Sequence, residues 1–379
     1  MRFDHATLIL PDRVIEDGHL IIEAGKIVSI GEGPLDEAVS LEGKMVFPGF
    51  IDMHIHGADG ADFMDGEADA IGTILHAVLQ EGTTAVLATT MTESIPNIER
   101  ALSAIGQYTQ APSCAHLLGV HLEGPFLNQK HPGAQDIKHI IPGDATLFNA
   151  FQAKAQGKIK LVTLAPEVQS PNFLEALNKQ GILLSMGHSD ATHAQVVEAR
   201  TQGIKRVTHC YNAMRGMHHR DIGLVGSALL YDDMDIELIA DLHHVSVPAL
   251  QLAAKLKKGR MQLITDSVSA KYGPEGTYQL GGQTIEYSGG TVRTQSGALA
   301  GSVLRMSEAA RHMHETVKMA LPDLAHALSG RAAETLGLDA ERGKIAVGLQ
   351  ADLTILDASF NVVMTVIGGR IVYHKEISS

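Results

Sequence analysis

The run MVFPGFIDMHIHG at residues 45–57 carries the strongest structural signal in this chain. An apolar segment leads into His54 and His56, which are two residues apart and are each followed by a small or apolar residue. Because side chains alternate across a strand, both histidines point to the same face, and the H-x-H spacing can place two imidazoles on one cation. The alternative is a pair of core histidines that cap the bottom of the fold, which the direction of the run disfavours.

Seven further apolar runs follow, with helical patterns between most of them, at 68–80, 96–108, 173–180, 191–203 and 247–258. The runs are TTAVLATT (83–90), HLLGVHLE (116–123), KIKLVTLAPE (158–167), ILLSMGH (182–188), KRVTHC (205–210), IELIADLHH (236–244) and MQLITD (261–266). Apolar runs that alternate with amphipathic helices predict parallel strands joined by crossovers. Eight strands favour closure into an α/β fold of the (β/α)8 TIM-like barrel type, which helices at about 303–318 and 321–337 would complete.

Both ends of the chain contain short strand-like segments, such as HLIIEAG near the start and VVMTVIGG near the end. We expect these ends, residues 1–48 plus 345–379, to form one small β-sandwich domain beside a catalytic barrel over residues 49–344. The length of 379 residues leaves room for this second unit, since a typical barrel needs roughly 250 residues. A Gly-rich stretch at 272–301 contains the hairpin-like TYQLGGQTIEY and predicts an insertion over the barrel mouth.

The composition argues against several classes of partner. Acidic residues number 43 against 30 basic ones, for a net charge of −13, which disfavours nucleic-acid binding. No apolar run approaches the roughly 18 residues of a membrane span. Cys114 and Cys210 form no C-x-x-C pair, and the N-terminal MRFDHATLIL lacks a signal-peptide pattern, so we expect a cytoplasmic protein without disulfides.

Polar side chains end nearly every predicted strand. In a parallel barrel the carboxyl ends of the strands converge on one face, and burying several imidazoles and carboxylates there is costly unless they are paired or bind a metal. Taken singly, His188 or His209 is more commonly explained as an ordinary buried histidine, and Asp266 can be a residue that orients a metal-bound histidine. Taken together with Glu123, these residues favour a metal site. The residues at strand ends are His54, His56, Glu123, His188, His209, Asp241, His243, His244 and Asp266.

Eight motifs resemble the N-acetylglucosamine-6-phosphate deacetylase family, a branch of the amidohydrolase superfamily. H-x-H marks only the superfamily, whereas HLEGPF and THCYNAM are specific to the branch. The motifs run in order over most of the chain: GFIDMHIHG (49–57), GVHLEGPFLN (119–128), TLAPE (163–167), GHSDAT (187–192), THCYNAM (208–214), HHRDIGLVG (218–226), LITDSVSA (263–270) and SGALAGSVL (296–304).

The resemblance implies roles for individual residues. It implies a main metal site of Glu123, His188 and His209, a second-metal site of His54 and His56, and Asp266 as catalytic acid/base. One or two divalent cations per subunit are implied, with Zn²⁺ or Fe²⁺ foremost and Mn²⁺ or Co²⁺ also suited to nitrogen and oxygen ligands. A homodimer in which Arg220 reaches across the interface is implied as well. The substrate-binding residues implied for the phosphosugar are Ala134, Gln135, Asn212, Ala213, Arg220, His244, Leu299, Ala300 and Gly301.

Two departures from the family pattern affect the substrate pocket. Many members have a histidine where Gln135 stands in KHPGAQD, and the family's A-D-G-x-H-V reads ADLHHV here, with Leu242 in place of glycine. The first departure concerns contact with the sugar, and the second concerns the shape of the phosphate pocket.

The expected reaction is hydrolysis of the acetamide of N-acetyl-D-glucosamine 6-phosphate, in amino-sugar catabolism or recycling. A divalent cation would activate water, and Asp266 would pass the proton of that water to the leaving amine. Related enzymes that act on another N-acetylhexosamine 6-phosphate, or on another amide, are the nearest alternatives. Cyclic amidohydrolases fit less well, because the TLAPE strand end offers no lysine to bridge two metals. A sugar-phosphate sensor without turnover would lack the acid/base that Asp266 supplies.

Overall fold

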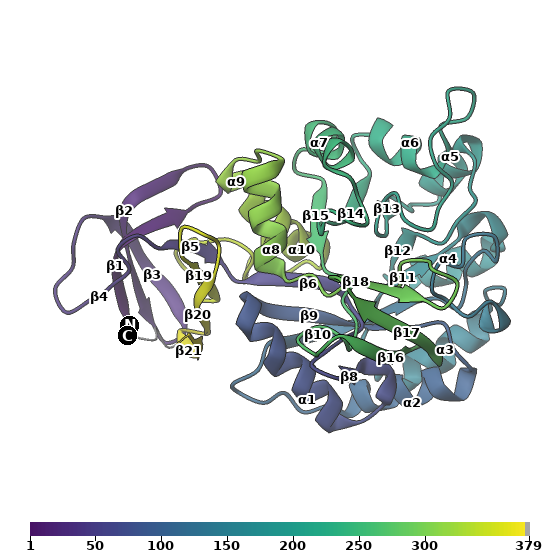
Figure 1. Ribbon diagram of the computed structural model, residues 1–379, viewed down its shortest axis with the longest axis horizontal. Coiled ribbons are helices and arrows are strands. Elements are labelled where there is room, and N and C mark those ends of the chain that lie inside the picture. The colour runs from purple at the N-terminus through teal and green to yellow at the C-terminus, as the bar shows by residue number, and fades with distance from the viewer. Residues whose placement is uncertain (376–379) are drawn as a thin grey trace.

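The computed structural model describes residues 1–375 and contains a small sheet and a larger α/β body, which lie side by side along the long axis (Figure 1). The larger body is built on eight parallel strands in the order β15-β14-β13-β12-β11-β10-β9-β6. Their bounds are β6 (Phe50–Ile55), β9 (Thr83–Thr90), β10 (His116–Glu123), β11 (Ile159–Leu164), β12 (Leu183–Met186), β13 (Arg206–Val207), β14 (Asp235–Ile239) and β15 (Met261–Ile264).

The outer strands of this order, β6 and β15, meet just beyond the end of β15. The N–H of Asp266 donates to the carbonyl of His54 at 2.8 Å, and the N–H of His56 donates to the carbonyl of Ser267 at 2.8 Å. These bonds close the sheet, so the prediction of a (β/α)8 barrel is confirmed. They also fix Asp266 directly beside the two histidines of β6.

Helices cover the outside of the barrel. Five of them match the expected helices: α1 (Ala68–Ala77), α2 (Ile95–Gln107), α4 (Pro171–Lys179), α5 (His193–Thr201) and α7 (Val247–Leu256). Two more, α3 (Ala145–Lys154) and α6 (Gly223–Leu230), lie outside the expected set. Helix α6 reads GLVGSALL and is buried over all but its last residue, so it has no polar face to produce a helical period. The expected helices at 303–318 and 321–337 are α8 (Met306–Arg311), α9 (Leu321–Ala325) and α10 (Arg331–Thr335), with π-helical turns at His312–Thr316 and His326–Gly330.

The apolar run at 45–56 is two strands, not the single strand that its composition predicts. Strand β5 (Met45–Pro48) joins the small sheet, and β6 begins the barrel after Gly49. The Gly49 N–H donates to the Asp352 carbonyl at 2.8 Å, and a Cβ at this position would collide with the side chain of Thr84. The chain changes sheet at a residue whose backbone must approach its neighbours closely, and hydrophobic periodicity does not reveal such a change.

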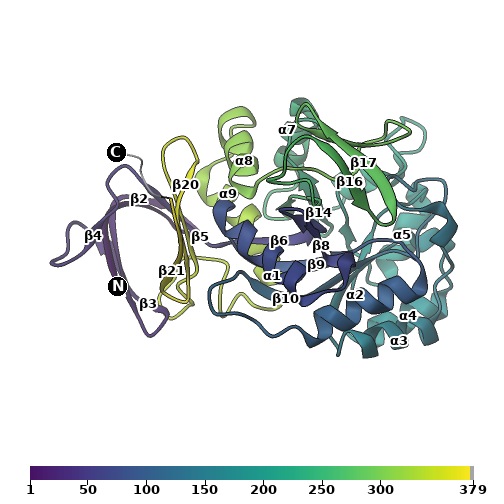
Figure 2. The same cartoon turned by 60° about the horizontal axis from the view of Figure 1, so that its bottom comes forward.

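The small sheet combines strands from both ends of the chain, in the order β21-β20-β19-β5-β1-β2-β3, with β4 beside β1. It folds over so that β2 and β20 lie on opposite sides (Figure 2), around buried residues such as Phe3, Leu20 and Leu353. The predicted limits of the two domains, 1–48 plus 345–379 and 49–344, stay a prediction. The strands are β1 (Arg2–Ile9), β2 (Val14–Glu23), β3 (Lys26–Glu32), β4 (Val39–Ser40), β19 (Leu353–Leu356), β20 (Val362–Ile367) and β21 (Arg370–His374).

Two small sheets lie near the carboxyl ends of the barrel strands. Strands β7 (Gly57–Ala58) and β8 (Ala61–Asp62) form one, and the expected insertion forms the other as β16 (Gly276–Leu280), β17 (Gln283–Ser288) and β18 (Thr291–Thr294). The β16–β17 turn is tied to the opposite loop, because the Gln283 side-chain amide donates to the Ala134 carbonyl at 2.7 Å. Across the described residues, 1–375, the helices are too short or too polar to span a membrane.

Candidate metal centre and active site

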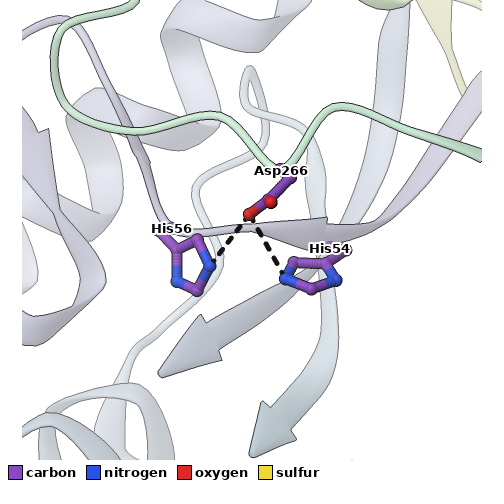
Figure 3. Close-up of side chains that lie close together, drawn as sticks. All are labelled: His54, His56 and Asp266. Carbon is purple, nitrogen blue, oxygen red and sulfur yellow. Dashed lines mark ion pairs between the residues drawn. The ribbon is translucent and has the colours of Figure 1, made fainter. Parts of the chain in front are cut away.

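Two groups of three side chains converge at the carboxyl ends of the barrel strands. Glu123, His188 and His209 form one group, and His54, His56 and Asp266 form the other, with the ligand atoms of each group within 4.8 Å of one another. Figure 3 shows one oxygen of Asp266 facing both rings of the second group. Both groups are buried or nearly so, which makes their convergence costly without a cation or protons to balance it.

Glu123 lies between the two groups and links them. Its Oε1 is 3.2 Å from His188 Nε2 and 3.1 Å from His209 Nε2, while its Oε2 is 3.3 Å from His56 Nε2. Burial raises the pKa of Glu123, but the charge of His54 and the hydrogen bonds from the other imidazoles outweigh burial and hold that pKa well below its usual value. The carboxylate is therefore ionised and faces both groups at once.

The distances within the first group fit a tetrahedral cation. His188 Nε2 and His209 Nε2 are 3.2 Å apart. Two nitrogens bound tetrahedrally to one zinc-like ion at about 2.0–2.1 Å from it would be about 3.3 Å apart. The donors are nitrogen and oxygen without sulfur, which suits Zn²⁺, Fe²⁺, Mn²⁺ or Co²⁺. The residues present therefore fit a divalent metal.

Asp266 faces the second group from the seam where the barrel closes. Its Oδ1 is 3.1 Å from His56 Nε2 and 3.4 Å from His54 Nε2. Burial raises the pKa of Asp266, whereas the charge of His54 and the hydrogen bond with His56 lower it, and the net effect is a pKa below the usual value. An ionised carboxylate at this place can accept a proton from water at neutral pH.

Carboxylate and carbonyl groups behind the histidines fix two of the rings. His54 Nδ1 donates to Glu237 Oε2 at 3.2 Å, and Glu237 Oε1 in turn accepts from Arg206 at 3.0 Å. His188 Nδ1 donates to the His131 carbonyl at 2.9 Å. Each bond leaves the Nε2 of its ring free to point toward the cation position, as is usual for metal-binding histidines.

Gln135 contacts Glu123 as well as lining the pocket. Its side-chain amide donates to Glu123 Oε2 at 2.8 Å, and its carbonyl accepts the Thr92 N–H at 2.8 Å. The second bond sets the orientation of the amide, so that its NH₂ group must face the carboxylate. Where many members of the resembling family have a histidine, this chain has a side chain that orients the bridging glutamate.

A pocket of about 250 Å³ opens above these groups. Most of the predicted substrate-binding residues line it, including Ala134, Gln135, Asn212, Ala213, His244, Leu299 and Gly301. Ala300 does not line it: the residue is fully buried and its N–H donates to the Val292 carbonyl at 3.0 Å. Ala300 therefore supports the loop between the two predicted neighbours that do reach the pocket.

One imidazole that lines the pocket is held in a fixed position by its own loop. His244 Nδ1 donates to Asp241 Oδ2 at 2.6 Å, and the backbone N–H groups of His243 and His244 donate to Asp241 Oδ1. The preceding Leu242 has a φ of 67°, a conformation in which the glycine of the family would be unstrained. The Leu242 substitution thus keeps the loop conformation at the cost of backbone strain.

Arg220 lies on the surface and does not line the pocket of its own chain. Its guanidinium donates to the ring of His219 at 2.8 Å, within an exposed loop that also contains Met217, whose exposed fraction is 61%. The predicted contact of Arg220 with a phosphate in the neighbouring subunit stays a prediction.

Other polar residues near the site are structural, and sequence reasoning missed some of them. Glu167 accepts from Asn128, from Ser189 and from the Asp190 N–H, so it ties loops together at the barrel mouth. His121 and Glu237 were missed, although each is a polar residue inside an apolar strand run. Burial and the charge of His54 lower the pKa of His121 to about 3, so this ring packs neutral against His54. The pocket also has apolar walls at Met91 and Leu280, which no motif indicated.

Comparisons with known proteins extend this description. The sequence profile of the Amidohydrolase family matches residues 45–372. The chain is 40% identical to the N-acetylglucosamine-6-phosphate deacetylase of Bacillus subtilis (strain 168), over 97% of this chain and 95% of that protein. It is 34% identical to the N-acetylgalactosamine-6-phosphate deacetylase of Escherichia coli O157:H7, over 96% and 97%. The crystal structure of N-acetylglucosamine-6-phosphate deacetylase from Thermotoga maritima superposes with a TM-score of 0.90 at 36% identity, covering 99% of this chain and 100% of that one.

Proposed function

Because the chain belongs to the amidohydrolase family, we propose that it hydrolyses the acetamide of N-acetyl-D-glucosamine 6-phosphate to D-glucosamine 6-phosphate and acetate, in amino-sugar metabolism. The observation that carries this proposal is the grouping of Glu123, His188 and His209 at the floor of a sugar-sized pocket, beside the carboxylate of Asp266. The identity of 40% to a deacetylase over nearly the whole chain supports the same substrate.

The proposed cofactor is one or two divalent cations per subunit, Zn²⁺ or Fe²⁺ in the first place, with Mn²⁺ or Co²⁺ also suited. Glu123, His188 and His209 would hold the first cation, and His54 and His56 the second. A cation held there supplies Lewis acidity, which lowers the pKa of water to about 7 and polarises an amide carbonyl.

Asp266 would move the proton. Its carboxylate accepts the proton of the attacking water and then delivers it to the amide nitrogen as the carbon–nitrogen bond breaks. The products balance: water supplies the oxygen and one proton that complete acetic acid, its other proton goes to the amine, and the acid then ionises to acetate. Because its own N–H is tied to the His54 carbonyl, Asp266 is held at a fixed distance from the histidines while it does so.

The phosphate end of the substrate would give orientation. Asn212, Ala213 and His244 line the pocket, where a donor from His244 and backbone N–H groups suit phosphate oxygens. We infer that Arg220 completes this end from the second subunit of a homodimer, because it lies on the surface of its own chain beside the exposed Met217. Binding energy gained at the phosphate then fixes the acetyl group against the reacting centre.

The proposed compartment is the cytoplasm, where reduced thiols persist, since Cys114 and Cys210 are both free. A second candidate substrate is N-acetyl-D-galactosamine 6-phosphate, and its support is the 34% identity to an enzyme named for that epimer.

The test is a substrate panel on metal-loaded protein, with acetate release measured for both phosphorylated epimers and for unphosphorylated N-acetylglucosamine. We expect the glucosamine epimer to be preferred. The unphosphorylated sugar should be at least about 100-fold slower in kcat/KM, the factor that corresponds to a loss of about 2.7 kcal/mol of phosphate binding.

The variant Asp266→Asn should lose about 10²–10⁴-fold in kcat while still binding metal. Arg220→Ala should raise KM for the phosphorylated sugar alone. Unchanged acetate release by Asp266→Asn would refute the proposed acid/base.

A further inference from the structure

The two histidines of β6 differ in how their second ring nitrogen is bonded. His54 Nδ1 donates to Glu237, whereas His56 Nδ1 is buried and has no hydrogen-bond partner in the described residues. A metal-binding imidazole almost always donates its other N–H to a carboxylate, a carbonyl or a water, because that bond fixes the tautomer and the ring orientation. The bonding of His56 is therefore incomplete.

Asp62 lies close to His56 and has a buried acceptor oxygen without a donor. Its exposed fraction is 6%; its Oδ1 accepts the Met64 N–H at 2.8 Å, and its Oδ2 is buried without a partner within residues 1–375. One buried acceptor and one buried donor, each unpaired, would cost free energy if they did not serve each other.

The backbone brings these two residues together. Asp62 pairs with Gly57 across the two-stranded sheet β7–β8, so it stands opposite the residue that follows His56. The next residue, Phe63, donates its N–H to the His56 carbonyl at 2.9 Å. Burial raises the pKa of Asp62 to about 7, and the charge of His56 is the largest influence that opposes this rise.

We propose that Asp62 is a positioning residue for His56: its Oδ2 accepts the Nδ1 proton of His56 through one intervening water molecule, which leaves Nε2 unprotonated and turned toward the second cation. A single water suits this place, because the two buried polar atoms make no direct bond to each other or to any other described residue. Asp62 would thus orient the ring of His56 as Glu237 orients the ring of His54. This inference rests on the proposed function, in that it requires a cation between His54 and His56.

The test measures metal binding rather than turnover. Metal-free protein is titrated with Co²⁺, and heat and the visible spectrum of the bound ion are recorded for the wild type and for Asp62→Asn. The replacement keeps the shape of the side chain and the acceptor for Met64 but presents an NH₂ group in place of Oδ2. Glu67→Gln is the matched control, because Glu67 is an exposed carboxylate five residues further along that makes no side-chain cap bond. His56→Asn shows the titration of a protein without the second site.

We expect Asp62→Asn to weaken one of the two Co²⁺ affinities by about 10–100-fold, and to change the spectrum of that ion, while the other affinity stays at the wild-type value. Glu67→Gln should titrate like the wild type. Co²⁺ affinities of Asp62→Asn equal to those of the wild type would overturn the proposal. An equal weakening of both affinities would also overturn it, because it would indicate a general disturbance of the barrel mouth. If the wild type and His56→Asn both take up a single ion, the two-cation arrangement of the proposed function fails instead.

Discussion

Replacing Glu237 by glutamine should destabilise the metal-free protein strongly. Glu237 is fully buried; it accepts from Arg206 through Oε1 at 3.0 Å and from His54 through Oε2 at 3.2 Å. Burial raises the pKa of this carboxyl, but the charge of Arg206 outweighs burial and holds the pKa far below its usual value, so the native group is charged. A glutamine has one acceptor oxygen, so either Arg206 or His54 must face its NH₂ group. Breaking a buried ion pair on one side costs about 3–5 kcal/mol.

The assay is thermal unfolding of metal-free protein. Since 1 kcal/mol shifts the Tm of a domain of about 150–250 residues by about 2–4 °C, we expect Glu237→Gln to lower the Tm by about 6–20 °C. The exposed Glu286→Gln makes the same change of charge on the β16–β17 hairpin and should leave the Tm unchanged. A double variant that adds Arg206→Met removes both charges and should lose less than the sum of the two single variants. A Tm of Glu237→Gln within about 1 °C of the wild type would refute the reasoning.

Two more outcomes follow from the same site. Burial lowers the pKa of His56, but hydrogen bonds to Asp266 and Glu123 outweigh burial and raise this pKa to about 9 in the metal-free protein. The charge on His56 therefore stabilises the fold fully below about pH 6.5, and this stabilisation is lost as the pH rises through 9. The Tm of the metal-free protein, followed from pH 6 to 10, should therefore fall over that window, and a flat profile would contradict the assignment. Gln135→Ala leaves the buried Thr92 N–H unpaired and frees one side of Glu123, so steady-state kinetics should show a lower kcat with little change in KM. A raised KM at constant kcat would instead mean that Gln135 binds the sugar.

The barrel, and the convergence of the candidate metal ligands at its mouth, could be predicted from the sequence because the strands follow a regular pattern. Each strand is an apolar run that ends in a polar residue, and strand ends of a parallel barrel converge whatever the intervening loops do. This rule brings together Glu123 and His188, which are 65 positions apart. The resemblance then supplied most of the residues that line the pocket.

What could not be predicted depends on side-chain orientation and on close approach of the backbone. The contact of Gln135 with the sugar stays a prediction, and its amide direction is set by Thr92, a partner 43 residues away that no pattern links to it. Ala300 was expected at the pocket, yet its place is decided by a backbone bond to Val292. The change of sheet at Gly49 leaves no periodic trace, since strands on both sides of it are apolar and buried.

The small sheet pairs strands that are synthesised far apart in time. Strand β5 pairs with β19, more than 300 residues later, and β5 leads through Gly49 directly into the strand that holds His54 and His56. During synthesis, β5 must therefore wait with an open edge until β19 emerges, and an open edge is a template for pairing with other chains. The strand that holds His54 and His56 is thus anchored to the small sheet only after β19 has been made, so we expect a chain cut short before Leu353 to be prone to aggregation.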